Sequence, residues 1–361
     1  MTKFDYLTIA CAWLLAGLIS FLCTPVAKKL AHKIGAIDIP KDNRRMHKKP
    51  IPRLGGFAIF LGFFISTMIF TFNFISLPIY GLLTGAMIIV ALGMADDVLA
   101  LKASWKFIVQ LIAVAIPVAC GIRIERFPDF FGNGSYIELP YGWSFAISII
   151  WLLAILNAVN IIDGLDGLAC GVSSIMTICV TVILILLEAP QVAIIAAALA
   201  GACMGFLPYN VNPAKLFMGD TGSMFIGYTL ACLSIIGLFK AYAIVAFFVP
   251  VMLFLLPIFD LVFAAVRRVL TGHSPMQADK SHLHHKLIAI GFSQRQAVAI
   301  LYGVAALLGF CAVLITADSF VKAMMIIGVA FVFILLGAFV LYRREKKAEK
   351  EPQQEDSSEQ N

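Results

Sequence analysis

Polar residues with metal-binding oxygens recur at intervals of three in the segment 157–167, which reads NAVNIIDGLDG. The four residues of this row are Asn157, Asn160, Asp163 and Asp166. Side chains three or four residues apart are neighbours on a helix surface, so a continuing helix would project all four toward one point. Carboxylate and amide oxygens suit hard divalent cations, and the glycines at 164 and 167 let a phosphate approach the backbone. The segment therefore indicates a site for a cation and a phosphate, with polar helix capping as the structural alternative.

Two further acidic groups have simpler alternatives. Asp96 and Asp97, in the sequence GMADD, end an apolar helix, where two adjacent acids can both point at a cation. A solvated entry to a loop would also explain them, because the helix dipole disfavours acids at this end. Asp220, in FMGDTGS, follows a proline and a glycine and precedes a helix, so capping of that helix would explain it. The flanking glycines would equally let an anion or a metal ion come close.

Four of the six histidines lie in one polar loop, residues 267–287. His282, His284 and His285 could ligate a metal ion, or they could donate hydrogen bonds to phosphate or sugar oxygens. We favour the second role, because oxygen ligands are already grouped elsewhere in the sequence. The expected cation is then Mg²⁺, which takes carboxylates, phosphate oxygens and water rather than imidazole.

The elements that carry these residues are apolar enough to lie in a membrane. The 361 residues are 61% hydrophobic and 13% charged, with a mean hydropathy of +0.94, which excludes an ordinary water-soluble surface. Because a span of about 30 Å of hydrocarbon needs about 20 apolar helical residues, we predict an all-α polytopic membrane protein with about eleven transmembrane helices. They cover the ranges 4–23, 56–75, 79–94, 105–120, 143–162, 172–187, 192–207, 217–238, 241–263, 297–317 and 320–341. The shorter ones leave a re-entrant pair as an alternative.

The distribution of basic residues predicts the orientation, because positively charged loops tend to stay in the cytoplasm. With the N-terminus outside, 22 of the 27 Lys and Arg residues lie inside, together with all the polar segments described above. The C-terminus and the site are then cytoplasmic. The net charge of +6 follows from this asymmetry, so no nucleic-acid partner is needed to explain it. A site at one membrane face also argues against a secondary transporter, whose site lies near the midplane.

Together these segments resemble the polyprenyl-phosphate N-acetylhexosamine-1-phosphate transferases, which include the enzymes that prime teichoic acid and O-antigen synthesis. The similarity covers nearly the whole chain. It rests on Asp96–Asp97, NAVNIIDGLDG at 157–167, FMGDTGS at 217–223 and DKSHLHHKL at 279–287, and PRLGG at 52–56 and NVNPAK at 210–215 also look similar. The His-x-His-His pattern is similar to the GlcNAc-1-phosphate branch rather than to the more distant MurNAc-pentapeptide translocase.

The resemblance implies transfer of GlcNAc-1-phosphate from UDP-GlcNAc to undecaprenyl phosphate at the cell membrane, with UMP as the other product. Mg²⁺ would be required, with Mn²⁺ as a substitute. The implied metal contacts are Asn160 and Asp220. The implied catalytic acids are Asp96, Asp97, Asp163 and Asp166, of which Asp96 would deprotonate or orient the lipid phosphate. The implied substrate-binding residues are Lys106, Asn157, Arg268, His282, His284 and His285.

These expectations give one transmembrane transferase domain, residues 1–342, and a disordered cytoplasmic tail, residues 343–361. The active-site loops of the domain are 27–55, 95–104, 163–171, 208–220 and 264–296. Direct attack by the lipid phosphate is the preferred mechanism, and a covalent aspartyl-phosphate route stays open. Another donor, UDP-GalNAc or UDP-MurNAc-pentapeptide, also stays open, as do a homodimer, a transporter and a nonenzymatic scaffold.

Overall fold

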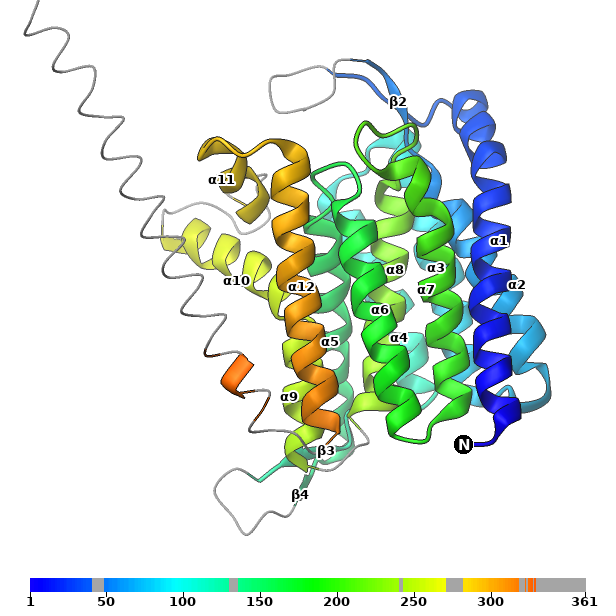
Figure 1. The fold of residues 1–361 in the computed structure, drawn as a ribbon, viewed down its shortest axis with the longest axis vertical. Helices are drawn as coiled ribbons and strands as arrows, with labels where there is room; N and C mark the ends of the chain where they lie inside the picture. The colour runs from blue at the N-terminus through cyan, green and yellow to red at the C-terminus, as the bar shows by residue number, and fades with distance from the viewer. Residues whose placement is uncertain are drawn as a thin grey trace, which may run out of the picture.

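The protein is mostly helical, and its helices run side by side as a bundle (Figure 1). The computed structural model describes residues 1–40, 49–129, 136–239, 243–270 and 282–317, together with five residues between 322 and 328. Three predicted features therefore lie wholly or largely outside the described residues: the start of the DKSHLHHKL motif, the last helix at 320–341 and the tail from 343.

Within the described part of the chain, eight helices are long and apolar enough to cross a membrane. They are α1 (Lys3–Ile34), α2 (Gly55–Thr71), α3 (Leu77–Leu99), α5 (Tyr141–Ile161), α6 (Leu168–Leu186), α7 (Pro190–Asn210), α8 (Gly219–Leu233) and α12 (Gln294–Thr316). The spans that contain α2 and α8 continue as helix to Phe74 and Leu238, so each is 20 residues long. The pair α9 (Ala243–Leu253) and α10 (Leu255–Leu270), bent by 74°, forms a ninth span if it is taken as one. α4 (Ala103–Ala119) is apolar but shorter, and α11 (Leu283–Ala289) is a short helix.

The prediction of a polytopic helical membrane protein is confirmed, whereas the count of eleven spans is not. Several predicted boundaries are wrong: α1 continues from Cys23 to Ile34, α3 continues from Met94 to Leu99, and α6 begins at Leu168. Hydropathy marks where a chain leaves the hydrocarbon, but backbone hydrogen bonding continues into the polar residues beyond. α3 ends only at Ala100, whose left-handed backbone (φ 50°) stops it.

Two short hairpins mark the opposite ends of the bundle (Figure 1). At one end β1 (Ile37–Asp38) pairs antiparallel with β2 (Ile51–Pro52), and at the other β3 (Arg126–Pro128) pairs with β4 (Tyr136–Glu138). The β1–β2 end also carries α11 and the connections that follow α5 and α7 (Figure 1). Two short turns complete the elements: η1 (Phe72–Phe74) follows α2, and η2 (Ser234–Leu238), a π-helical turn, follows α8.

The centre of the bundle is α8, which is nearly all buried and packs against α2, α3 and α5. Polar side chains in this interior find partners: the Tyr228 hydroxyl donates to the Leu82 carbonyl at 3.0 Å, and the Thr229 hydroxyl donates to the Phe225 carbonyl at 2.9 Å. α1 lies at the edge of the bundle and exposes Leu14, Leu18 and Leu22. Such pairing is favourable because no water reaches a bilayer core.

Helices α1 and α7 approach each other closely through glycines. Gly201 and Gly205 lie one turn apart on α7 and face the backbone of α1 at Trp13 and Gly17. A Cβ at position 201 would overlap the Trp13 carbonyl oxygen, so a larger residue would push the two helices apart. Small residues are common at such contacts, because membrane helices associate through close packing rather than through a hydrophobic effect.

Replacing Gly201 by Ala should therefore lower the free energy of unfolding by about 1–3 kcal/mol, the usual cost of overpacking. Gly303→Ala on α12 is the matched control, because nothing lies within 4 Å of a Cβ placed there. Alanine favours a helix over glycine at both positions, so packing alone distinguishes the two variants. The measurement is the thermal unfolding midpoint of each purified variant in detergent. Equal midpoints would contradict this account of the contact.

Candidate active site

A cavity of about 250 Å³ opens at the β1–β2 end of the bundle. Its charged and polar lining residues come from segments far apart in the sequence: Asp38, Arg53, Asp97, Asp163, Asp166, Asn210, Asp220, His285 and Gln294. Four of the five predicted aspartates therefore share one cavity. Asp96, the fifth, is not among the lining residues.

The PRLGG and FMGD segments, which both contribute residues to the cavity lining, pair along their backbones. The Phe217 amide donates to the Pro52 carbonyl at 2.9 Å, and the Gly55 and Gly56 amides donate to the carbonyls of Phe217 and Met218 at 2.9 and 2.8 Å. Gly56 packs directly on the start of α8, where a Cβ would overlap the backbone of Gly222. This close contact explains why glycines are needed in both segments.

The carboxylate of Asp97 anchors the first turn of α8. It accepts hydrogen bonds from the Asp220 and Thr221 amides at 3.0 and 3.1 Å and from the Thr221 hydroxyl at 2.6 Å. The Asp97 side chain is almost completely buried, and the Nε atom of Arg53 lies 3.8 Å from its Oδ1 atom. Asp97 therefore caps α8 from a neighbouring helix, which is favourable because a helix N-terminus carries partial positive charge.

Asp220 does not cap its own helix, so helix capping does not explain this residue. Met218 occupies the N-cap position, and no side chain of the segment caps it. The Asp220 carboxylate instead contacts the Lys106 ammonium, which also lies 2.8 Å from Asp96. Asp96 accepts a second hydrogen bond, at 2.8 Å, from the Leu101 amide. One ammonium from the first turn of α4 thus bridges two of the predicted site carboxylates.

The row Asn157, Asn160, Asp163 and Asp166 does not share one helical face, because α5 ends at Ile161. Only the last two residues line the cavity. Asn160 accepts a hydrogen bond from the Ser223 hydroxyl at 2.7 Å, and Asn157 donates to Gln110 and to the Leu153 carbonyl at 3.2 and 2.9 Å. The two asparagines therefore pack α5 against α8 and α4.

The two aspartates beyond α5 have different surroundings. Asp166 accepts hydrogen bonds from the Asn212 side chain at 2.9 Å and from the Ala214 amide at 3.0 Å, so it holds the loop after α7. Asp163 has no hydrogen bond of this kind within the described residues and is partly exposed to the cavity. Burial, together with the charges of Asp220, Asp97 and Asp166, raises the pKa of Asp163 to about 8.

The three predicted histidines divide into one that lines the cavity and two that do not. His285 lines it. The Nδ1 atom of His282 lies 3.1 Å from the Oδ2 atom of Asp260, and the Asp260 carboxylate also accepts a hydrogen bond from the Leu283 amide at 2.8 Å. His284 is buried against Gly164, and its Nε2 has no hydrogen-bond partner among the described residues. Burial lowers the pKa of His284 to about 4, so its side chain stays neutral. The last predicted residue, Arg268, lies in the final turn of α10 and not among the cavity residues.

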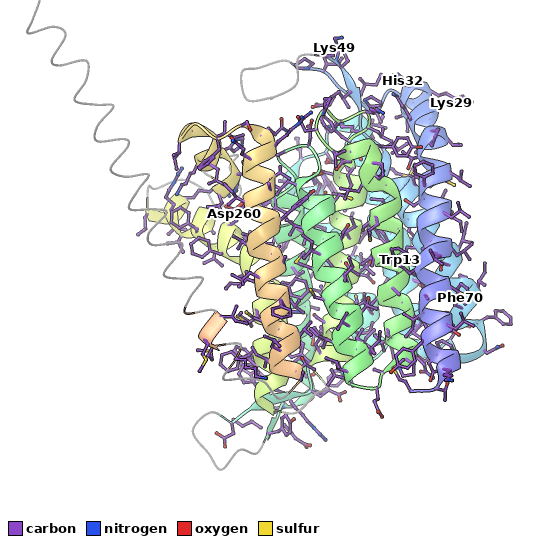
Figure 2. The ribbon with its side chains drawn as sticks, in the orientation of Figure 1. Trp13, Lys29, His32, Lys49, Phe70 and Asp260 are labelled. Carbon is purple, nitrogen blue, oxygen red and sulfur yellow. The ribbon has the colours of Figure 1, made fainter. Side chains whose placement is uncertain are left out.

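Sequence reasoning missed several residues of this end of the molecule. Arg53 and Gln294 line the cavity, and Asp260, in the second turn of α10, holds the start of α11 (Figure 2). Arg53 had a usable signal, since it stands inside the PRLGG segment. Asp260 had a weaker one, as the only acid deep in an apolar run before the histidine loop. Nothing in the sequence around Gln294 distinguishes it from a surface residue.

The bundle and its acidic end cavity define a multi-pass membrane protein with a polar site at the helix ends. Residues 79–238 match the model of the family described as glycosyl transferase family 4. The chain is 36% identical over 336 residues, 92% of each chain, to a Bacillus subtilis protein named "Probable undecaprenyl-phosphate N-acetylglucosaminyl 1-phosphate transferase". The chain therefore belongs to glycosyl transferase family 4.

Two further relatives have similar names. The decaprenyl-phosphate N-acetylglucosaminephosphotransferase of Mycolicibacterium smegmatis is 33% identical, over 95% of this chain and 91% of its own length. The undecaprenyl-phosphate alpha-N-acetylglucosaminyl 1-phosphate transferase of Escherichia coli K12 is 29% identical, over 88% and 85%.

Replacing Asp97 by Asn should destabilise the fold by about 1.5–3 kcal/mol, because a neutral amide is a weaker acceptor for the N–H groups of α8. Thr221→Val removes the hydroxyl donor to the same carboxylate. If the two side chains act through this contact, the double variant should lose less stability than the sum of the single variants. Thermal unfolding of the four proteins in detergent measures this coupling, and strict additivity would argue against it.

Proposed function

We propose that the protein transfers GlcNAc-1-phosphate from UDP-GlcNAc to undecaprenyl phosphate and releases UMP. The observation that carries the proposal is one cavity, at the end of a membrane bundle, that holds Asp163, Asp220, Arg53 and His285. The names of relatives that match nearly the whole chain support the same transfer. Both substrates are phosphate anions, so the site must offset their repulsion and hold them in line.

The cytoplasmic side is our proposed location for the cavity. The end of α1 on this side carries Lys28, Lys29 and Lys33, whereas Arg123 and Arg126 at the opposite end are each paired with a glutamate. An excess of Lys and Arg favours the cytoplasmic face. This face is also where a water-soluble nucleotide sugar can meet a phosphate that is anchored in the membrane.

A Mg²⁺ ion suits the donor set of the cavity. Among the described residues, no three His, Cys, Asp or Glu side chains form a metal cage by themselves. Mg²⁺ seldom uses such a cage, because it binds through one or two carboxylates together with substrate phosphates and water. Asp220 and Asp163 line the cavity and would hold the ion, which when bound neutralises charge on the donor diphosphate.

Direct transfer requires one bond to form and one to break. A phosphate oxygen of the lipid attacks the β-phosphorus of the donor, and the bond from that phosphorus to the bridging oxygen breaks. UMP leaves with the bridging oxygen and its electron pair, so a fully ionised lipid phosphate needs no base. Arg53 and His285 line the cavity and can donate to phosphate oxygens, while Lys106 offsets the charge of Asp96 and Asp220.

Asp220→Asn and Asp163→Asn should each lower the transfer rate by about 10²–10³, the usual effect of removing one preorganised electrostatic group. Glu138→Gln is the control, because Glu138 is exposed in β4 at the opposite end of the bundle. The assay follows radiolabelled sugar from UDP-GlcNAc into the lipid phase of proteoliposomes, and chelation of divalent cations should stop it. An Asp163→Asn protein with near-normal rate would contradict the proposed site.

The same assay identifies the sugar donor. We expect the label of UDP-GlcNAc to enter undecaprenyl phosphate, and that of UDP-GalNAc and UDP-MurNAc-pentapeptide to remain in the aqueous phase. UDP-GalNAc differs at a single hydroxyl, which one or two hydrogen bonds can discriminate. Preferential use of either alternative donor would keep the proposed chemistry but replace the proposed substrate.

Cation binding should depend on pH through Asp163, whose pKa burial and neighbouring charges raise to about 8. A cation must displace this proton, so the apparent affinity for Mg²⁺ should fall about tenfold for each pH unit below the pKa. Affinity is read as the Mg²⁺ concentration that gives half of the maximal thermal stabilisation of the UMP-bound protein. Asp163→Asn should bind Mg²⁺ more weakly and with a flatter dependence on pH. An equally steep dependence in both proteins would exclude Asp163 as its source.

A further inference from the structure

A second cavity, of about 520 Å³, adjoins the acidic cavity and shares Asp166 and Gln294 with it. It lies between the end of α1, the residues that lead into β2 and the loop after α7. Four of its lining residues are basic: Lys28, His32, Lys49 and Lys215. The proposed transfer reaction gives this cavity no role.

Within the described part of the chain, two of the basic residues in this cavity have side chains that are free to bind a ligand. The side chains of Lys28 and Lys215 make no ion pair or hydrogen bond with the described residues. Among the described lining residues Asp166 is the one carboxylate, and it already accepts hydrogen bonds from Asn212 and Ala214. The cavity therefore suits an anion that can accept hydrogen bonds from two lysines.

An apolar surface leads from the membrane to the basic cavity. α1 exposes Leu14 and Phe21, which stand four and two helical turns before Lys28, so the three side chains share one face of the helix and form an apolar stripe below Lys28. The centroid of the Phe21 ring lies 5.2 Å from the centroid of the Tyr209 ring on α7. Aromatic rings at this level are typical of the boundary between hydrocarbon and headgroups.

The basic residues lie together beyond this stripe. Figure 2 shows Lys29 and His32 at the end of α1, with Lys49 farther out beside β2. The Lys215 amide donates to the Tyr209 carbonyl at 2.8 Å, which ties the loop that carries Lys215 to the aromatic pair. A molecule with an apolar tail and an anionic head would therefore meet first the stripe and then the lysines.

We propose that the basic cavity binds the phosphate headgroup of a membrane lipid whose chain lies along the exposed apolar stripe of α1. Lys28 and Lys215 donate charge-assisted hydrogen bonds to the phosphate oxygens, and His32 and Lys49 line the same site. An anionic phospholipid and the polyprenyl phosphate acceptor share this chemistry. The inference is independent of the proposed transfer reaction, because lipid binding can be measured without any nucleotide sugar.

The test is binding of phosphatidylglycerol to the purified full-length protein in detergent, measured by native mass spectrometry. Lys28→Gln/Lys215→Gln should weaken binding about tenfold, the loss expected for charge-assisted hydrogen bonds. Lys29→Gln/Lys33→Gln is the matched control, because it also removes two positive charges, both from α1 residues outside the cavity lining. The control should change binding by less than about twofold. An equal loss in both double variants, or no loss in the first, would overturn the proposal.

Three competitors identify the source of the phosphate. Displacement of phosphatidylglycerol by a polyprenyl phosphate assigns the cavity to the acceptor lipid, and failure of that displacement assigns it to phospholipid. Phosphatidylcholine, which has no net charge, should compete only weakly. Displacement by inorganic phosphate at the same concentration as the lipids would show that the apolar stripe adds nothing, and would overturn the lipid assignment. Thermal unfolding confirms that both variants are folded, and the single variants repeat the test if a double variant is not.

Discussion

The contact between the Asp97 carboxylate and the first turn of α8 determines where the other site residues lie. α8 is the buried centre of the bundle, so a shift of its N-terminus would be transmitted to α2, α3 and α5. The carboxylate accepts three hydrogen bonds from this turn, and Gly219 adopts a left-handed backbone (φ 73°) beside it. A side chain at position 219 would collide with Asp97. The helix start can therefore reach the carboxylate only through glycine.

The charges at this end of the bundle are unequal, and the imbalance is informative. Asp97, Asp163, Asp166 and Asp220 line one small cavity, and Arg53 is the permanently charged basic residue among its described lining residues. The Lys106 ammonium, which is not among the lining residues, contacts the carboxylates of both Asp220 and Asp96. Like charges held this close destabilise a protein unless they are used, so the cluster supports the substrate and cation site that we propose.

The sequence predicted the bundle and most of the acidic cluster, because both follow from composition and local spacing. The Asp163–Asp166 pair and Asp220 were found since each follows or precedes an apolar run at a glycine. Helical spacing wrongly grouped Asn157 and Asn160 with the two aspartates that follow them. It assumed that the helix continues through those aspartates, whereas α5 ends at Ile161. The count of spans was less reliable, since an apolar run does not show whether a helix is bent, as α9 and α10 are.

Contacts between distant segments could not be predicted in the same way. Asp260 and His282 are 22 residues apart and meet because α10 turns sharply away from α9. The three histidines look equivalent in the sequence, yet only His285 lines the cavity, while His284 is buried against Gly164. The basic cavity was also not predicted, because its lysines come from three separate segments.

The short length of α4 has a consequence for the surrounding lipid. With 17 residues it is about 26 Å long, whereas the hydrocarbon core of a typical bilayer is about 30 Å thick. A bilayer adapts to such a mismatch by thinning locally, which draws its headgroups inward around the helix. The exposed Trp105 in the first turn of α4 suits this boundary. Lipid headgroups beside α4 would thus sit deeper than elsewhere, toward the first turn of the helix, which also carries Lys106.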